Sequence, residues 1–363
     1  MANTTKEPDK ITAPALTSDQ KLSFWAIGGT VLTLWALNWA GLAFKDTERG
    51  TTGDMFGIFN SLFAGLSFSA LIYTLYLQIN QNKIQQKEIE DARNEIEYQH
   101  NTDQLQSFEN RFYEQLKVHR ENVESISIAE LVKGRKAFVS MFNEFKFTYF
   151  VTKLVCESEK ELNQDFKMPS GAELVNISFL IFYLGTGPSS DKLTKKFFAA
   201  YDQSMINALL KKLREIRLNK ENKDSYLIET GDPEDPYIKF KMNYLPFGGH
   251  TSRLGHYYRH LFQTVTFIVE QNPVVVKDHY QYVKTLRAQL SDHEQLLLYY
   301  NGLSLFGKGW IDRGYFTDYR MIRNIPLPLA SFGIKPDELL GTHNSANQKL
   351  FEWDEIIDLT STF

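Results

Sequence analysis

Cysteine is almost absent from this chain of 363 residues. Cys156 is the only one in the sequence, so no disulfide can form within the chain, and this agrees with a reducing compartment. Cys156 lies in an apolar stretch, where we expect a small core residue rather than a nucleophile.

Proline is missing between Pro14 and Pro169, so long helices can run through this whole region. The sequence also has no glycine-rich phosphate loop, no internal repeat and no repeated alternation of strand and helix patterns. These absences predict a mainly α protein. A large excess of one sign of charge is also missing, because 40 basic and 44 acidic residues give a net charge of only −4. The near-neutral charge argues against a broad nucleic-acid surface and leaves any RNA chemistry to a small local site.

Two long runs contain no charged residue, although the mean hydropathy of −0.33 is that of an ordinary soluble protein. Leu22–Phe44 has 23 residues and Met55–Ile79 has 25. As a helix, each run extends roughly 35 Å, which is enough to cross a bilayer core of about 30 Å. Two core helices are a poorer interpretation because such runs seldom lie ten residues apart in a soluble domain. A cleaved signal peptide would not be followed by a second span. We expect a transmembrane hairpin over residues 22–79.

The positive charges flanking the two runs predict the orientation of the hairpin. Three lysines precede the first run and three basic residues follow the second, whereas the connecting loop holds two basic residues among three acidic ones. The positive-inside rule then places residues 1–21, as a tail, and everything after the hairpin in the cytoplasm. We expect a multi-pass protein with two spans and both termini cytoplasmic.

Small residues recur every four positions in the second run, at Gly57, Ser61, Gly65 and Ser69. On a helix they form one stripe, which lets two backbones approach closely. The stripe packs against the first span or, alternatively, joins subunits of a homo-oligomer.

Residues 80–107 are rich in Gln, Asn, Glu and Lys and predict a helical stalk with a short coiled-coil seam at Ile89, Ala92, Ile96 and Gln99. We expect one α-helical cytoplasmic domain over 108–363. Its first apolar stripe comprises Phe108, Phe112, His119, Val123 and Ile126. Further helices are expected at 129–156, 174–184 and 192–218, a loop at 219–236 and a short strand at 237–241.

The helix predicted at 250–270 carries a polar face beside an apolar one. Arg253, His256, Tyr257 and His260 fall within about a 100° sector. Arg253 and His260 also have a spacing similar to the Arg-x(4–6)-His signature of HEPN ribonucleases. That resemblance implies a histidine for acid–base work and an arginine for phosphate charge. Arg253, His256 and His260 are therefore the candidate catalytic residues; the alternative is that they are structural side chains within a helical bundle.

A second polar group brackets a helix junction near residue 290. Ser291 and Glu294 have the spacing of a capping box, which predicts a new helix starting there. Arg287 is expected to pair with Glu294 or Asp292, although it could reach a phosphate instead. The candidate binding residues are Arg259, Arg287, Gln289 and Asn301. No HExxH motif or cysteine pair is present, so we expect no metal and no cofactor.

Four stretches, in order, resemble a family of phage abortive-infection proteins of the abortive-infection C type: FENRFYEQLKVHRENVESI (108–126), GRKAFVSMF (134–142), GHTSRLGHYYRHLFQTVTFI (249–268) and LRAQLSDHEQLLLYYNGLS (286–304). The resemblance covers roughly residues 80–325. It implies two membrane spans before a shared domain, a location in the bacterial inner membrane, and a role in phage defence in which an infected cell stops growing or dies. It supplies no catalytic residues.

Three functions remain open from the sequence. In the first, the cytoplasmic domain senses a phage component, the chain oligomerises and the hairpin disturbs the lipid bilayer. In the second, the chain is a metal-independent HEPN-like ribonuclease that acts on RNA through Arg253 and His260. In the third, it is a non-catalytic membrane scaffold for another defence component.

Overall fold

The computed structural model describes residues 18–43, 53–187, 191–219, 225–229, 236–241 and 243–353. They divide into two compact units, Met1–His100 and Asn101–Phe363. The described part of the chain is mainly helical, with two small antiparallel hairpins, so the predicted mainly α class is confirmed.

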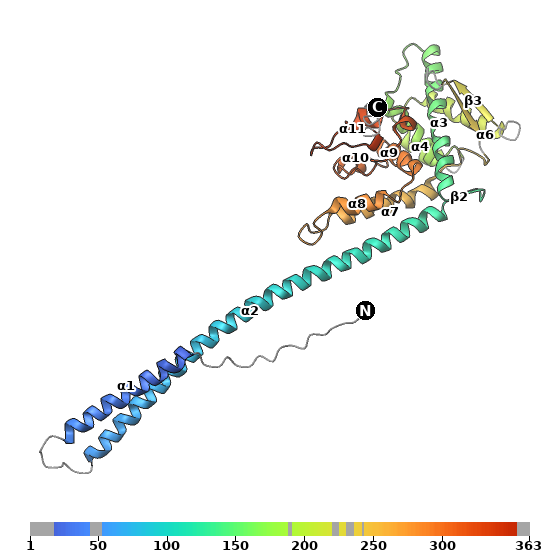
Figure 1. Cartoon of the computed structure of the whole chain (residues 1–363). Helices are drawn as coiled ribbons and strands as arrows, with labels where there is room; N and C mark the ends of the chain where they lie inside the picture. Colours follow the sequence, from blue (N-terminus) through green and yellow to red (C-terminus); the bar gives the residue numbers. More distant parts are fainter. Residues whose placement is uncertain are drawn as a thin grey trace, which may run out of the picture. The chain divides into compact units, whose positions relative to one another are not determined.

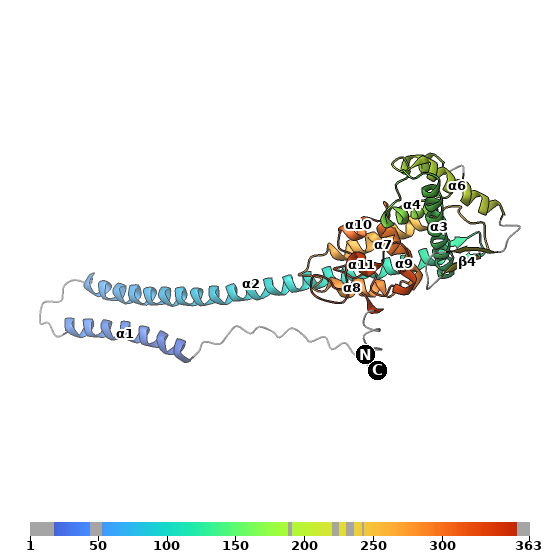
Figure 2. The ribbon, with the colours of Figure 1, turned by 90° about the horizontal axis from the view of Figure 1, so that it is seen from above.

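The first unit contains α1 (Ser18–Ala43) and the beginning of α2 (Gly53–Ser125). Figure 2 shows α1 running beside the first turns of α2. Gly65 lies at their contact, because a Cβ built there would be 3.0 Å from Val31 Cγ1. Ser69, one turn further along, is buried, whereas Gly57 and Ser61 are exposed. The predicted stripe of small residues thus meets α1 at Gly65.

One helical segment of the described residues, Asn60–Ser125, is long and apolar enough to cross a membrane. Large apolar side chains on its first turns are exposed, among them Phe63, Phe68 and Leu71. In α1 a shorter apolar stretch, Gly28–Leu37, is found. The first predicted run extends beyond Gly28–Leu37 over residues 22–27 and 38–44, of which residue 44 lies outside the described residues. The second run begins before Asn60, at Met55.

The polar part of α2 continues as helix through the residues expected to form a stalk. Ile89 and Ile96 are 63% and 67% exposed, so the predicted seam has no partner among the described residues. Beyond residue 100 the same helix enters the second unit. There the predicted stripe from Phe108 to Ile126 is buried, His119 included.

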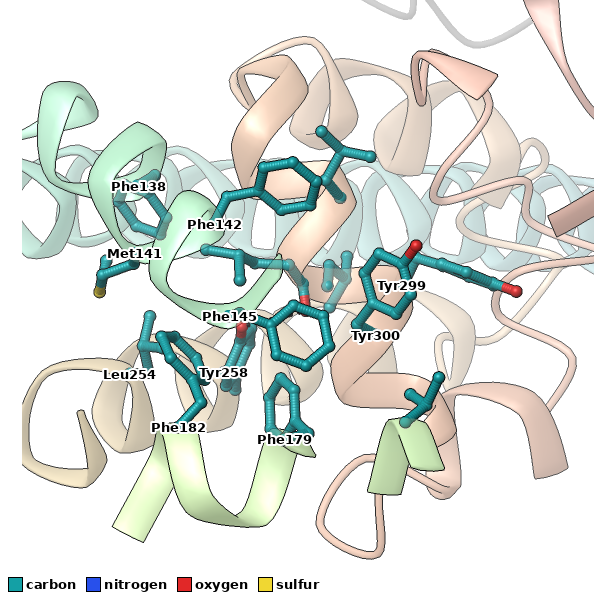
Figure 3. Close-up of a cluster of buried hydrophobic side chains, with 14 of the residues drawn as sticks. Phe138, Met141, Phe142, Phe145, Phe179, Phe182, Leu254, Tyr258, Tyr299 and Tyr300 are labelled. Atoms are coloured by element: carbon teal, nitrogen blue, oxygen red, sulfur yellow. Dashed lines mark hydrogen bonds between the residues drawn. The ribbon is translucent and has the colours of Figure 1, made fainter. Parts of the chain in front are cut away.

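In the second unit, α3 (Arg135–Leu162) packs against α4 (Gly171–Leu184) and α9 (Asp292–Leu303). Aromatic rings from all three helices fill the space between them; Figure 3 shows the facing rings of Phe145, Phe179 and Tyr300. The apolar run at 174–184 is therefore a buried helix, as predicted. Cys156 is also buried in this core, and burial raises the pKa of its thiol to about 11, which suits a packing role.

Two boundaries in the second unit differ from the predictions. The helix expected from residue 129 starts at Arg135, because β1 (Ser127–Ile128) and β2 (Val132–Lys133) form a short hairpin before it. The helix expected over 192–218 is two helices, α5 (Asp191–Phe197) and α6 (Gln203–Leu218). Asp202 separates them because its side chain accepts a hydrogen bond from the backbone N–H of Met205 and so caps α6.

The predicted strand at 237–241 is confirmed as β4 (Tyr237–Lys241), but its partner was missed. β3 (Ser225–Glu229) pairs antiparallel with β4 inside the stretch that was predicted to be a loop. A loop then leads to α7 (Thr251–Val269), α8 (His279–Arg287) and α9, which lie near one another in Figure 1. Short helical segments complete the described chain: α10 (Gly309–Asp312), a 3-10 helix (Leu327–Ala330) and α11 (Pro336–Leu340).

Candidate functional site

The loop before α7 fixes where the candidate catalytic residues lie, and a buried carboxylate holds this loop. Glu144 of α3 accepts hydrogen bonds from Tyr244 Oη (2.6 Å) and from the N–H of Phe247 (2.8 Å). His250 Nε2 lies 3.2 Å from the same carboxylate. Burial opposes ionisation of Glu144, but His250 and these hydrogen bonds hold its pKa below the ordinary value. Glu144 is therefore the anchor for the start of α7.

The same loop lies tightly against the end of α4. Gly249 has φ +85°, and a Cβ there would lie 2.5 Å from the carbonyl oxygen of Leu184, so only glycine fits. The N–H of His250 donates to the carbonyl of Tyr183 (2.9 Å). The entry of α7 is thus tied to both α3 and α4 by its backbone.

Arg253 and His256 line a small polar pocket of about 260 Å³. The Arg253 guanidinium donates to the carbonyls of Ser127 (2.6 Å) and Gly249 (3.1 Å), and so joins α7 to the β1–β2 hairpin. His256, one turn later, is exposed. The guanidinium N–H groups of Arg253 that are not used in these two bonds could hold a small anion, and the exposed imidazole of His256 could exchange a proton with it.

His260 lies elsewhere. Its Nε2 is 3.1 Å from the carbonyl of Gln115 on α2, and burial lowers its pKa although this contact opposes the shift. The ring of His119 is stacked on that of His260, with centroids 6.4 Å apart. Arg253 and His260 thus each bond a backbone carbonyl from a different segment, and the pocket contains the first but not the second.

Tyr257 was assigned to the polar face but is buried, and its hydroxyl donates to Glu294 Oε1 (3.0 Å). Glu294 Oε2 also accepts from the N–H and the hydroxyl of Ser291, which confirms the predicted capping box. His119 Nε2 lies 3.9 Å from this carboxylate, and neither ring nitrogen of His119 has a hydrogen-bond partner among the described residues. Burial, followed by the charges of His260 and Arg135, lowers the pKa of His119 to about 4.

Two buried carboxylates organise the site, a role that the sequence pattern did not indicate. Glu144 and Glu294 each join a tyrosine hydroxyl and a histidine on segments far apart in the chain. The only signal for Glu144 was a charged residue between aromatic ones, in the run MFNEFKF at 141–147.

The candidate binding residues separate into two places. Arg287 is buried, and its Nη1 donates to the carbonyl of Arg320 (2.7 Å), so the predicted pair with Glu294 or Asp292 is wrong. The carboxylate of Glu294 is instead directed into its own capping box. Gln289 is half-buried near this junction, and its carbonyl accepts from Arg135 Nη2 (3.0 Å).

Arg259 and Asn301 line a second pocket, of about 320 Å³, together with the rings of Tyr183, Tyr258, Phe262, Phe306 and Trp310. We call this the aromatic pocket. Among the described residues, no group of three or more His, Cys, Asp or Glu side chains could hold a metal ion.

Residues 249–328 match the model of the family described as "Putative phage abortive infection protein". The match confirms the predicted family resemblance over these residues. It includes α7, α8, α9 and nearly all residues of the aromatic pocket, and it covers two of the four stretches on which the resemblance was based. No curated protein and no solved structure matches the chain. The family match indicates a general role in phage abortive infection.

Proposed function

We propose that the protein is a membrane-anchored abortive-infection protein whose second unit detects infection and whose membrane segment carries out growth arrest or membrane damage. The observation that carries this proposal is the family match over residues 249–328. The segment lies in a unit with a well-packed aromatic core, which suits a sensing role better than a role inside lipid.

The proposed anchor is a hairpin of two spans in the bacterial inner membrane, with both termini in the cytoplasm. It is supported by the uncharged runs, by the apolar helix of the first unit and by its exposed Phe63, Phe68 and Leu71. A soluble protein seldom exposes so many large apolar side chains together. A reporter fused to either terminus should be active on the cytoplasmic side, and a periplasmic signal from either fusion would contradict this topology.

The proposed mechanism needs no catalysed reaction: a phage component binds the second unit, chains associate and the hairpin disturbs the bilayer. The close approach of Gly65 to Val31 supports a contact between α1 and α2 that can transmit such a change. Gly65→Leu combined with Ser69→Leu should abolish phage protection and the loss of membrane potential on infection. Gly57→Leu is the matched control, since a Cβ there meets no atom within 4 Å. Full protection by the double variant would overturn this mechanism.

The ribonuclease alternative is favoured by one observation, the pocket shared by Arg253 and His256. Under it, His256→Ala should abolish both protection and cleavage of RNA in infected cells, whereas His260→Ala tests the residue indicated by spacing alone. The exposed His343→Ala serves as a control. Intact RNA in infected cells carrying the unaltered protein would rule out this alternative and leave the sensor or a plain scaffold.

A further inference from the structure

The aromatic pocket lies between α7 and the segment that follows α9, away from the pocket of Arg253 and His256. We infer that it binds a nucleoside phosphate, with the base among the aromatic rings and the phosphate at Arg259. This inference goes beyond the proposed function, because it names a small molecule that the second unit recognises.

The walls of the pocket are suited to a flat ring. Trp310 stands edge-on to Phe262, with ring centroids 5.2 Å apart, and Tyr183 and Phe306 form a second pair at 5.0 Å. Trp310 and Tyr258 are almost completely buried, whereas Phe306 is 42% exposed and forms part of the opening. Every nucleobase, whichever of the bases it is, has a π face that stacks on such rings.

Arg259 supplies the charge that selects an anion. It is exposed on α7 and makes no ion pair with a described residue, unlike Arg253 and Arg287, whose guanidinium groups are bound to backbone carbonyls. Arg259 and Tyr183 line the same pocket, and the positive charge of Arg259 opposes the rise that burial causes in the pKa of the Tyr183 hydroxyl. A free guanidinium at the opening of an aromatic pocket matches the geometry of a phosphate.

Two further features fit a ligand of defined polarity and size. The buried Asn301 carries an amide, which can both donate to and accept from the edge of a base. Glycines keep the walls close, because a Cβ at Gly255 would lie 2.9 Å from Tyr183 Oη and one at Gly309 would lie 3.2 Å from the Phe262 ring. The volume of about 320 Å³ is at the lower end of the range for small-molecule pockets.

The test is calorimetric titration of the full chain in detergent micelles with AMP, GMP, CMP and UMP, and with adenosine and inorganic phosphate alone. At least one monophosphate should bind saturably with a Kd below about 1 mM. Arg259→Gln should weaken its binding about tenfold and leave adenosine unaffected, because one charge-assisted contact is lost. Phe306→Ala should weaken the monophosphate and adenosine alike, by about tenfold, because both lose a stacking surface.

Exposed residues away from the pocket provide matched controls. Arg111→Gln on α2 and Tyr237→Ala on β4 should leave every affinity unchanged. The inference is overturned if no monophosphate binds at about 5 mM, or if Arg259→Gln binds as tightly as the unaltered chain. Tighter binding of an acidic peptide containing tryptophan than of any monophosphate would also overturn it, in favour of a protein partner. None of these results bears on the membrane anchor, so the two proposals fail separately.

Discussion

The first turns of α2 and the whole of α4 have similar apolar compositions and opposite environments. In α2, Phe63, Phe68 and Leu71 are exposed, whereas in α4 every aromatic side chain except Tyr183 is buried against α3 and α9. The two helices differ in length and in what packs against them. α4 has 14 residues and fits inside an aromatic core, whereas the apolar part of α2 is longer and, within the described part of the first unit, lies beside α1. An apolar helix therefore indicates a bilayer only when nothing in the fold can cover it.

A second difference concerns charge. The second unit buries the carboxylates of Glu144 and Glu294, each held by a tyrosine and approached by a histidine. Among the residues of the first unit whose exposure the structure describes, no charged side chain is buried. A core can accept a charge where several polar groups from distant segments converge on it, and a pair of helices offers no such convergence.

Introducing the same charge into both apolar helices tests the comparison most severely. Phe179→Lys in α4 should destabilise the second unit by more than about 4 kcal/mol, because it buries an unpaired charge. Phe68→Lys in α2 should leave that unit folded but cost about 2.5–3.5 kcal/mol of membrane insertion. Near-ultraviolet circular dichroism measures the first effect and the fraction retained in alkali-washed membranes the second. If Phe68→Lys unfolds the second unit and stays in the membrane, the contrast between the helices is wrong.

Glu144→Ala should be the next largest change. It removes the acceptor of Tyr244 and of the Phe247 N–H and leaves His250 without its carboxylate, which should cost about 3–5 kcal/mol of folding free energy. Glu161→Ala on the exposed face of the same helix should change stability by less than about 0.5 kcal/mol. Urea unfolding followed by aromatic circular dichroism compares them, and equal midpoints would show that the buried network contributes nothing.

Acidification should weaken the second unit partly through His119. Its pKa is lowered from 6.5 to about 4 in the fold, so the unfolded chain binds the proton more readily and stability falls as pH drops from 6.5 towards 4. Between pH 7 and pH 5 this amounts to about 2 kcal/mol. His119→Leu should therefore show a smaller fall in unfolding free energy over this interval, measured at both pH values. An undiminished fall would assign the pH dependence to other groups.

The smallest expected effect lies in the first unit. Gly65→Leu forces a side chain against Val31 and should destabilise the α1–α2 contact by about 1–2 kcal/mol, raising the amide exchange rates of α1 about tenfold. Gly57→Leu adds the same side chain at a position where the Cβ has no atom within 4 Å. Equal exchange rates in both variants would show that α1 does not depend on this contact.

Local pattern was enough to predict many of the helices and the capping box at Ser291. Both depend on residues a few positions apart: periodic apolar residues bury one face, and a side chain at one end of a helix satisfies a nearby N–H. The break at Asp202 was local too, yet the alternation of basic and apolar residues across 192–218 concealed it. β3 was missed because a two-stranded hairpin has little pattern of its own.

The arrangement of the candidate sites depended on contacts that spacing does not reveal. Arg253, His256 and His260 share a helix face, yet their surroundings differ. Arg253 is hydrogen-bonded to the carbonyl of Ser127, His256 is exposed, and His260 contacts the carbonyl of Gln115. For Arg253 and for His260, this partner lies more than a hundred residues away in the chain. In the same way Arg259 and Asn301 meet in one pocket while Arg287 bonds to Arg320.

The sequence by itself determined the helical class, the uncharged runs and the family resemblance, since composition and local periodicity carry that information. Only the tertiary structure decided which polar side chains have a hydrogen-bond partner within the fold and which remain available to a ligand. The reason is that a buried polar group must find its partner wherever the fold brings one, and α3, the loop before α7 and α9 meet only after the chain has packed.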